Sequence, residues 1–184
     1  MPSGDHAKTP ESFASSKNWL SAARFLSGFS RPFALDLRNH GDSPHSESHS
    51  LEDMIADLRE WLRERQLDET VLLGHSMGGL VAMGFALSSP QSVRGLIVVD
   101  ILPRAYRIDF SREFEALSLD LSPYESRGEI DEAMAEIVPE LQVRQFLQMN
   151  VERREGGFYW KLNVPALRSA EFLRGPDFSV FQLS

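Results

Sequence analysis

The stretch over residues 71–79 constrains the fold of this chain more than any other feature. Val71–Leu73 is an aliphatic run of strand character, and the pattern over 77–87 is helical. Between them lies Gly74-His75-Ser76-Met77-Gly78, a G-x-S-x-G motif, which predicts a sharp turn. We expect Gly74 and Gly78 to leave room where any Cβ would clash. The stretch therefore predicts a strand, a strained serine turn and a helix in direct succession.

Helices and strands alternate through the first hundred residues. Helical apolar spacing covers residues 18–26, 51–67 and 77–87, and short apolar runs that predict strands cover residues 33–37, 71–73 and 96–99. The run Leu96–Val99 is aliphatic throughout, as is typical of a strand buried on both faces. Ser50 is the expected N-cap of the second helix. This alternation predicts the α/β class, with a mainly parallel sheet flanked by helices.

The sequence divides into four segments. Residues 1–12 are polar and lack apolar periodicity, so we expect a disordered tail. Residues 13–103 carry the alternating pattern and form the expected, partial α/β core. Residues 104–157 hold helix-like stretches and, up to about residue 155, no convincing strand, which predicts a helical cap inserted into the core. Residues 158–184 lead back towards the core and are expected to be truncated.

The charge balance and the absence of cysteine exclude several classes of protein. Lys and Arg number 19 and Asp and Glu 27, and the net charge of −8 argues against a nucleic-acid binder. Without cysteine there is no disulfide, no cysteine-ligated metal and no cysteine nucleophile. The apolar runs are too short for a membrane span, and no signal-peptide pattern is present. We therefore expect a soluble cytoplasmic protein without cofactor. We also expect no metal, because His45 and His49 lack a third ligand nearby.

Ser76 is the candidate nucleophile. A serine held at the start of a helix has the backbone N–H of Met77 beside it as a donor to an oxyanion. Its hydroxyl needs a histidine base, which a carboxylate orients. Asp100 is the preferred acid because it follows a predicted strand, 24 residues after Ser76, at the sheet edge where catalytic groups gather. A helix N-cap or turn role for Asp100, and Asp177 as a later acid, stay open.

On these motifs the chain resembles the α/β-hydrolase fold family, and within it the small esterase branch of bacterial short-chain acyl esterases and mitochondrial abhydrolase-domain relatives. The matching pieces lie in the family's order and cover most of residues 13–167: Ser16–Trp19, Leu35–Ser46, Leu73–Gly79, Leu96–Ile101 and Trp160–Asn163. The resemblance implies an ester or thioester hydrolase with Ser76 as nucleophile and a small-molecule acyl substrate. By the same resemblance, the mitochondrial matrix is an alternative location for this chain.

The histidines depart from the family's pattern. The triad runs serine, acid, histidine along the chain, yet no histidine follows Ser76. The five histidines are His6, His40, His45, His49 and His75. We interpret His40 as a hydrogen-bonding loop residue and both His45 and His49 as solvated loop residues. Upstream of Phe13 no His-Gly pair supplies a second oxyanion donor. Both ends are therefore expected to be incomplete, and activity to be weak or absent.

Two hypotheses from different classes stay open. The first is a truncated serine hydrolase that lacks its base. The second is a non-catalytic ligand-binding or interaction protein on the same scaffold. Its candidate lining residues, for which helix packing is the commoner role, are Phe114, Leu117, Phe146, Leu147 and Met149. Dehalogenase and epoxide-hydrolase chemistry is disfavoured because those relatives carry Asp in place of Ser76. An incomplete parallel sheet exposes its edges, so we expect marginal stability or a homodimer.

Overall fold

A computed structural model of the chain describes residues 13, 15–103 and 109–170. These residues form two compact units. The sheet unit consists of residues 15–103, 109 and 162–170, and the helical unit consists of residues 13 and 110–161. Each unit is described by itself. The domain boundaries expected from the sequence stay predictions.

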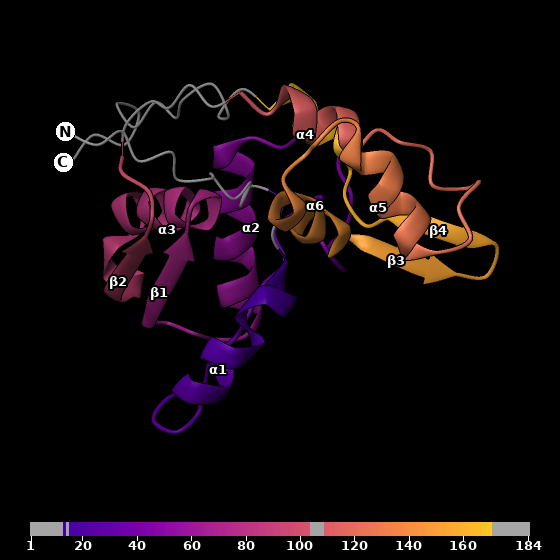
Figure 1. Ribbon diagram of the computed structural model, residues 1–184. Helices are drawn as coiled ribbons and strands as arrows, with labels where there is room; N and C mark the ends of the chain where they lie inside the picture. The colour runs from indigo at the N-terminus through magenta and orange to yellow at the C-terminus, as the bar shows by residue number, and fades with distance from the viewer. Residues whose placement is uncertain (1–12, 14, 104–108, 171–184) are drawn as a thin grey trace, which may run out of the picture. The chain divides into compact units, whose positions relative to one another are not determined.

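A β-α-β element forms the centre of the sheet unit (Figure 1). Strand β1 (Thr70–His75) leads into α3 (Met77–Ser88), and a short 3-10 helix, η3 (Pro90–Ser92), leads into β2 (Val93–Val99). The two strands pair in parallel, in a register that runs from Leu72 opposite Leu96 to His75 opposite Val99. The strand, turn and helix predicted over residues 71–79 are confirmed.

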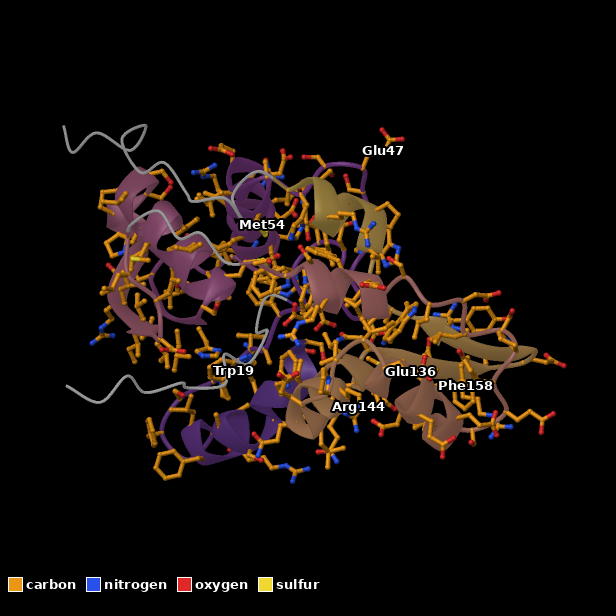
Figure 2. The ribbon with its side chains drawn as sticks, turned by 45° about the horizontal axis from the view of Figure 1, so that its top comes forward. Trp19, Glu47, Met54, Glu136, Arg144 and Phe158 are labelled. Carbon is orange, nitrogen blue, oxygen red and sulfur yellow. The ribbon has the colours of Figure 1, made fainter. Side chains whose placement is uncertain are left out.

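Helix α2 (Leu51–Glu64) packs against α3 and supplies much of the core of the sheet unit. The hydroxyl of Ser50 accepts a 3.1 Å hydrogen bond from the Asp53 N–H, so the expected N-cap is confirmed. The buried residues through which the two helices form this core are Leu51, Met54, Ile55, Leu62, Met77, Leu80, Val81 and Phe85. Met54 on α2 is fully buried in this cluster (Figure 2). Their spacing at one helix face explains why the sequence pattern predicted α2 correctly.

The expectation that β2 is buried on both faces is wrong. Leu73 of β1 and its pairing partner Ile97 of β2 are 39% and 48% exposed, and Val99 is 40% exposed. Helix α3 packs against both strands, and the side chains of Leu73, Ile97 and Val99 stay partly exposed. An aliphatic run predicts a strand, but its burial depends on which elements pack over it.

The strand expected over residues 33–37 is also absent. This stretch has no regular secondary structure, and Phe33 and Leu35 are 43% and 37% exposed. A strand exists only where a neighbouring strand completes the backbone hydrogen bonds, and neither β1 nor β2 pairs with this segment. The apolar run is therefore a chain segment with strand composition but no pairing partner among the described residues.

Three short helices complete the sheet unit. The 3-10 helix η2 (Ser16–Trp19) continues into α1 (Leu20–Leu26), which confirms the helix predicted over 18–26. Helix α7 (Val164–Ser169) carries Pro165 in its first turn, where proline is tolerated because its missing N–H has no intrahelical partner.

The helical unit contains three helices and one hairpin (Figure 1). The helices are α4 (Ser111–Ala116), α5 (Arg127–Ala135) and α6 (Leu141–Gln148). Strands β3 (Val151–Arg154) and β4 (Gly157–Trp160) pair antiparallel. The sequence analysis missed β3, because a strand of four residues rich in charge has little apolar alternation to mark it.

Aromatic rings and one ion pair organise the helical unit. The Phe13 ring lies edge-to-face against Phe110 and Phe114, with centroid distances of 5.6 and 5.3 Å. The guanidinium of Arg144, a residue only 8% exposed, donates to both carboxylate oxygens of Asp131 at 3.0 Å. This contact raises the pKa of Arg144 and lowers the pKa of Asp131. A buried arginine needs such a partner, because an unpaired buried charge is strongly destabilising.

The apolar residues that the sequence offered as a ligand lining do not form one surface. Phe114, Leu117 and Leu147 are buried in the core of the helical unit, whereas Met149 is 47% exposed. Core packing, the commoner role for such residues, is therefore what the structure shows for these three.

Candidate active site

Ser76 lies in the turn between β1 and α3 with φ 47° and ψ −119°. This conformation lies outside the left-handed helical region and is strained for any residue with a Cβ. The backbone holds it in place: the Ser76 N–H donates to the Val99 carbonyl at 3.0 Å, and the Ser76 carbonyl accepts from the N–H groups of Gly79 and Leu80. The half-buried hydroxyl makes no hydrogen bond that caps α3. The turn therefore holds the hydroxyl at the start of a helix without using it as a structural group.

Only one of the two glycines expected to be required around Ser76 meets steric crowding. A Cβ on Gly74 would lie 2.7 Å from the Gly79 Cα and would collide with the Gly78 backbone, so Gly74 is required as predicted. The expectation for Gly78 is wrong, because a Cβ there meets nothing within 4 Å. The second sterically required glycine is Gly79, where a Cβ would lie 2.6 Å from Cγ2 of Ile101. Gly79 faces β2, whereas the Cβ direction of Gly78 points away from neighbouring atoms.

Asp100 leaves β2 beside Ser76. His75 and Val99 are the last paired residues of the two strands, so Ser76 and Asp100 are the next residues at the same carboxyl edge. Asp100 also has a positive φ of 57°, and it is exposed. Residues held in sparsely populated conformations concentrate at functional sites. The structure thus brings the predicted nucleophile and the preferred acid to adjacent positions; Asp177 lies outside the described residues.

His75 contacts an aromatic ring from another part of the sheet unit. The Trp19 ring lies edge-on to the His75 ring with a centroid distance of 6.0 Å. His75 is the residue immediately before Ser76, so this contact joins the serine turn to the segment that contains η2 and α1. The sequence analysis placed Trp19 in a helix pattern and did not single it out.

The loop over residues 38–50 is built around Asn39, whose side chain bonds to several of its residues. Asn39 is fully buried at φ 67°, and its side-chain oxygen accepts hydrogen bonds from the Ser46 N–H at 2.7 Å and from the Asn163 amide at 3.0 Å. Its own amide donates to the Ser48 carbonyl at 3.0 Å. Asn163, which precedes α7, also donates to the Ser46 carbonyl at 2.9 Å. Two asparagines 124 residues apart in sequence therefore fix one loop.

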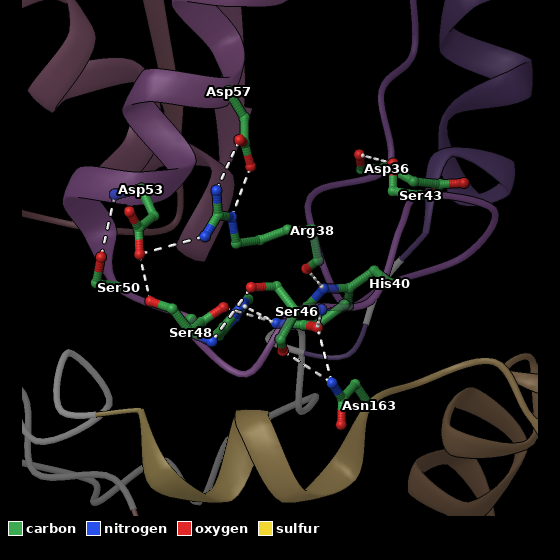
Figure 3. Close-up of polar contacts among 12 residues, drawn as sticks. Asp36, Arg38, His40, Ser43, Ser46, Ser48, Ser50, Asp53, Asp57 and Asn163 are labelled. Atoms are coloured by element: carbon green, nitrogen blue, oxygen red, sulfur yellow. Dashed lines mark hydrogen bonds and ion pairs between the residues drawn. The ribbon is translucent and has the colours of Figure 1, made fainter.

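Arg38 ties the same loop to α2 (Figure 3). Its guanidinium donates two hydrogen bonds to Asp57, at 2.6 and 2.7 Å, and lies 3.2 Å from Asp53. The hydrogen bond to Asp57 raises the pKa of Arg38. Hydrogen bonds from Ser48 and Ser50, together with the Arg38 charge, lower the pKa of Asp53. A bidentate arginine–carboxylate pair has a defined geometry, so it fixes the orientation of the loop as well as its distance from α2.

Asp36 closes the start of this loop. Its carboxylate accepts hydrogen bonds from the Ser16 N–H at 2.6 Å and from the Asp42 N–H at 2.9 Å. Gly41 passes beside that carboxylate at φ +53°, where a Cβ would lie 2.6 Å from Oδ1 of Asp36. The close approach explains why glycine occupies this position.

The histidines outside the serine turn differ in their environments. His40 is fully buried and its Nδ1 lies 2.9 Å from the Arg38 carbonyl, which fits the hydrogen-bonding role expected for it. The expectation that His49 is solvated is wrong: it is 4% exposed, and its ring centroid lies 5.4 Å from that of His40. Burial and the neighbouring His40 and Arg38 lower the pKa of His49 to about 3. His45 is exposed as expected, and His6 lies outside the described residues.

Among residues 13, 15–103 and 109–170, no three His, Asp or Glu side chains form a group that could hold a metal ion. No helix in the described part of the chain combines the length and apolar character needed to cross a membrane.

Comparisons with curated proteins reveal related sequences along most of the chain. The zebrafish (Danio rerio) protein named sn-1-specific diacylglycerol lipase ABHD11 is 34% identical over 177 residues, which are 90% of this chain and 56% of that protein. The mouse (Mus musculus) protein of the same name is 39% identical over 144 residues, 74% of this chain and 47% of its own length. The chain thus spans about half the length of these relatives.

Solved structures of hydrolases share the fold of this chain. A structure described as a marine microorganism esterase has a TM-score of 0.81 and 34% identity, and the match covers 88% of this chain and 64% of that one. An E-2-(acetamidomethylene)succinate hydrolase, at 20% identity and a TM-score of 0.70, matches 92% of this chain and 65% of its own and shows the fold alone. Residues 6–179 also match the sequence model of a family described as the alpha/beta hydrolase family. With the strand, serine turn and helix in place, the chain belongs to the α/β-hydrolase family.

Proposed function

We propose that this chain carries the nucleophile, the acid and one oxyanion donor of a carboxylic ester hydrolase acting on small acyl esters or thioesters. One observation supports this most strongly: Ser76, at φ 47° and ψ −119°, lies beside Asp100 at the carboxyl edge of two paired strands. The printed names of the relatives, lipase and esterase, describe the same reaction class. Strain of this kind persists only where the surrounding structure enforces it.

The proposed chemistry assigns one role to each group. The Ser76 Oγ attacks the acyl carbonyl carbon, and its proton passes to a base as the C–O bond forms. The N–H of Met77 belongs to the first turn of α3, where N–H groups have no intrahelical acceptor, so it can donate to the oxyanion. Asp100 orients and stabilises the protonated base. Expulsion of the alcohol or thiol, followed by attack of water on the acyl-enzyme, completes the cycle.

The base is the group for which this sequence offers no candidate in the family's order. No histidine follows Ser76 in this sequence. Of the histidines before it, His40 and His49 are buried in the loop over residues 38–50, where they contact each other. Loss of the base from a serine triad lowers turnover by several orders of magnitude. We therefore expect the chain by itself to hydrolyse esters only weakly.

A missing imidazole can be supplied from solution. The experiment measures hydrolysis of p-nitrophenyl butyrate by the chain and by Ser76→Ala across a series of imidazole concentrations. We expect an imidazole-dependent rate about tenfold higher for the chain than for Ser76→Ala, because only the chain presents a nucleophile to the added base. Asp100→Asn should lose most of this rescue. Ser76→Ala also corrects for the direct reaction of imidazole with the ester.

The outcomes separate two classes of protein. Rescue that requires both Ser76 and Asp100 supports the hydrolase assignment. Equal imidazole-dependent rates in the chain and in Ser76→Ala contradict it and favour a non-catalytic ligand-binding protein on the same scaffold. Rescue that requires Ser76 but not Asp100 would support Ser76 as the nucleophile and contradict the role of Asp100 as the acid.

A further inference from the structure

An exposed aromatic pair lies at the end of α1. Phe25 and Phe29 are 76% and 70% exposed, the two largest values among the exposed large hydrophobic residues, and Leu20 on the same helix is 53% exposed. The rings of Phe25 and Phe29 lie edge-to-face with a centroid distance of 5.9 Å. Figure 1 shows α1 and the turn after it projecting away from α2, α3 and the strand pair of the same unit. We call residues 20–31 the aromatic tip.

The aromatic tip is basic in an acidic chain. Residues 15–35 contain Lys17, Arg24 and Arg31 and neither Asp nor Glu, whereas the whole chain has a net charge of −8. All three cations are exposed. The ion pairs found within the described residues include none of them. The Arg31 guanidinium lies 5.0 Å from the centre of the Phe33 ring, and all three cations belong to the exposed surface of the segment that carries Phe25 and Phe29.

The backbone of the tip satisfies its own polar groups. The last carbonyls of α1 would otherwise lack partners. The hydroxyls of Ser27 and Ser30 donate to the carbonyls of Arg24 and Leu26 at 2.7 and 2.9 Å. The N–H groups of Ser27 and Ser30 also donate back to helix carbonyls, at 2.9 and 3.0 Å. These bonds made within the turn lower the penalty for moving it out of water.

We propose that the aromatic tip binds this chain to the surface of a membrane containing anionic phospholipids. Phenylalanine rings enter the boundary between headgroups and acyl chains, and nearby cations are attracted to anionic headgroup phosphates. Both features lie in one segment of twelve residues with its flanking Lys17. The binding is peripheral and requires no membrane-spanning helix. It goes beyond the proposed ester hydrolysis and does not depend on it.

The test is flotation of the full chain with vesicles of phosphatidylcholine, with and without phosphatidylglycerol, at low and high salt. We expect the chain to float with the anionic vesicles, and high salt to reduce this binding. Phe25→Ser with Phe29→Ser should weaken binding about tenfold or more, through loss of apolar burial. Each of Arg24→Gln and Arg31→Gln should weaken it about fivefold. Leu141→Ser with Met149→Ser, which removes exposed apolar residues of the helical unit, is the matched control and should bind normally.

A conservative variant tests the proposal even if the double serine variant does not fold. Phe25→Trp keeps an aromatic ring at the tip, and brominated acyl chains should quench its added fluorescence only in anionic vesicles. Absence of flotation, or equal binding by the control and by Phe25→Ser with Phe29→Ser, would overturn the proposal. Failure of ester hydrolysis would leave it unaffected, since neither measurement uses turnover.

Discussion

Two turns of the sheet unit hold non-glycine residues at positive φ in contrasting ways. Asn39, at φ 67°, is fully buried, and its side chain is hydrogen bonded to Ser46, Ser48 and Asn163. Ser76, at φ 47°, is half-buried and is held by main-chain hydrogen bonds and by the close approach of Gly74 to Gly78 and Gly79. In one turn the polar side chain stabilises the conformation. In the other the backbone does so and leaves the side chain available.

The difference separates a structural turn from a candidate reactive one. Asparagine tolerates the left-handed region better than most residues, and its bonds offset the remaining cost. Serine at ψ −119° has no such preference, so the strain at Ser76 is maintained by the packing around it. Measurements of stability can therefore distinguish the two turns without any assay of activity.

The largest expected effect is at Gly74. Gly74→Ala places a Cβ against the backbone of Gly78 and 2.7 Å from the Gly79 Cα, so we expect a loss of about 3 kcal/mol in the free energy of unfolding. Gly78→Ala, with open space around its Cβ, is the control and should be neutral or stabilising by up to about 1 kcal/mol, because alanine favours the helix. Urea denaturation of both variants checks this. Equal losses would show that packing does not hold the serine turn.

The next effect is at Asn39. Asn39→Gly keeps the backbone conformation but leaves the Ser46 N–H without its acceptor and removes one of the two acceptors of the Asn163 amide, so we expect a loss of about 2–3 kcal/mol. Gln66, exposed at φ 53°, is the matched position, and Gln66→Gly should not destabilise the chain. Urea denaturation measures both. A small effect at Asn39 would contradict the view that polar bonds stabilise this turn.

Acid should destabilise the loop over residues 38–50 through His49. The pKa of His49 in the folded chain is lowered to about 3 from 6.5, so the unfolded chain binds more protons between these values. Stability should thus be constant above pH 6.5 and fall by about 2 kcal/mol between pH 6.5 and about 5. His49→Gln should remove this component, whereas His45→Gln, at an exposed histidine, should not. Identical pH profiles for the two variants would argue against a buried neutral His49.

The smallest effect has the opposite sign. Ser76→Gly removes the Cβ from a strained conformation and should stabilise the chain by about 1 kcal/mol. Ser76→Ala removes only the hydroxyl and should leave stability within about 0.5 kcal/mol of the original. Thermal unfolding of the two variants makes the comparison. If glycine does not stabilise the chain relative to alanine, the strain at Ser76 is not energetically significant.

Local patterns predicted several elements correctly. The helix pattern over 51–67 gave α2 and its Ser50 cap because one face of a helix must be apolar to pack. The G-x-S-x-G motif predicted the strand, turn and helix around Ser76, and the position after β2 brought Asp100 beside it. In each case the information lies within a few consecutive residues.

Other features depended on contacts between distant residues. Residues 33–37 have strand composition but no pairing partner, and β2 has an aliphatic sequence but an exposed face. Asn39 and Asn163 lay within the pieces that resemble the family, yet no local pattern indicates that they bond to each other. No local pattern in this serine-rich loop predicted the burial of His49 either.

Local sequence patterns were sufficient to predict the fold class, the family and the serine turn, because periodicity and a glycine-flanked motif act over short distances. The folded structure was needed to show which glycine faces β2, which histidine is buried, and how Asn163 holds the loop of Asn39. It also showed that Phe25 and Phe29 meet at an exposed tip instead of in the core. Hydrogen bonds, burial and exposure are properties of groups brought together in space, and residue order does not specify them locally.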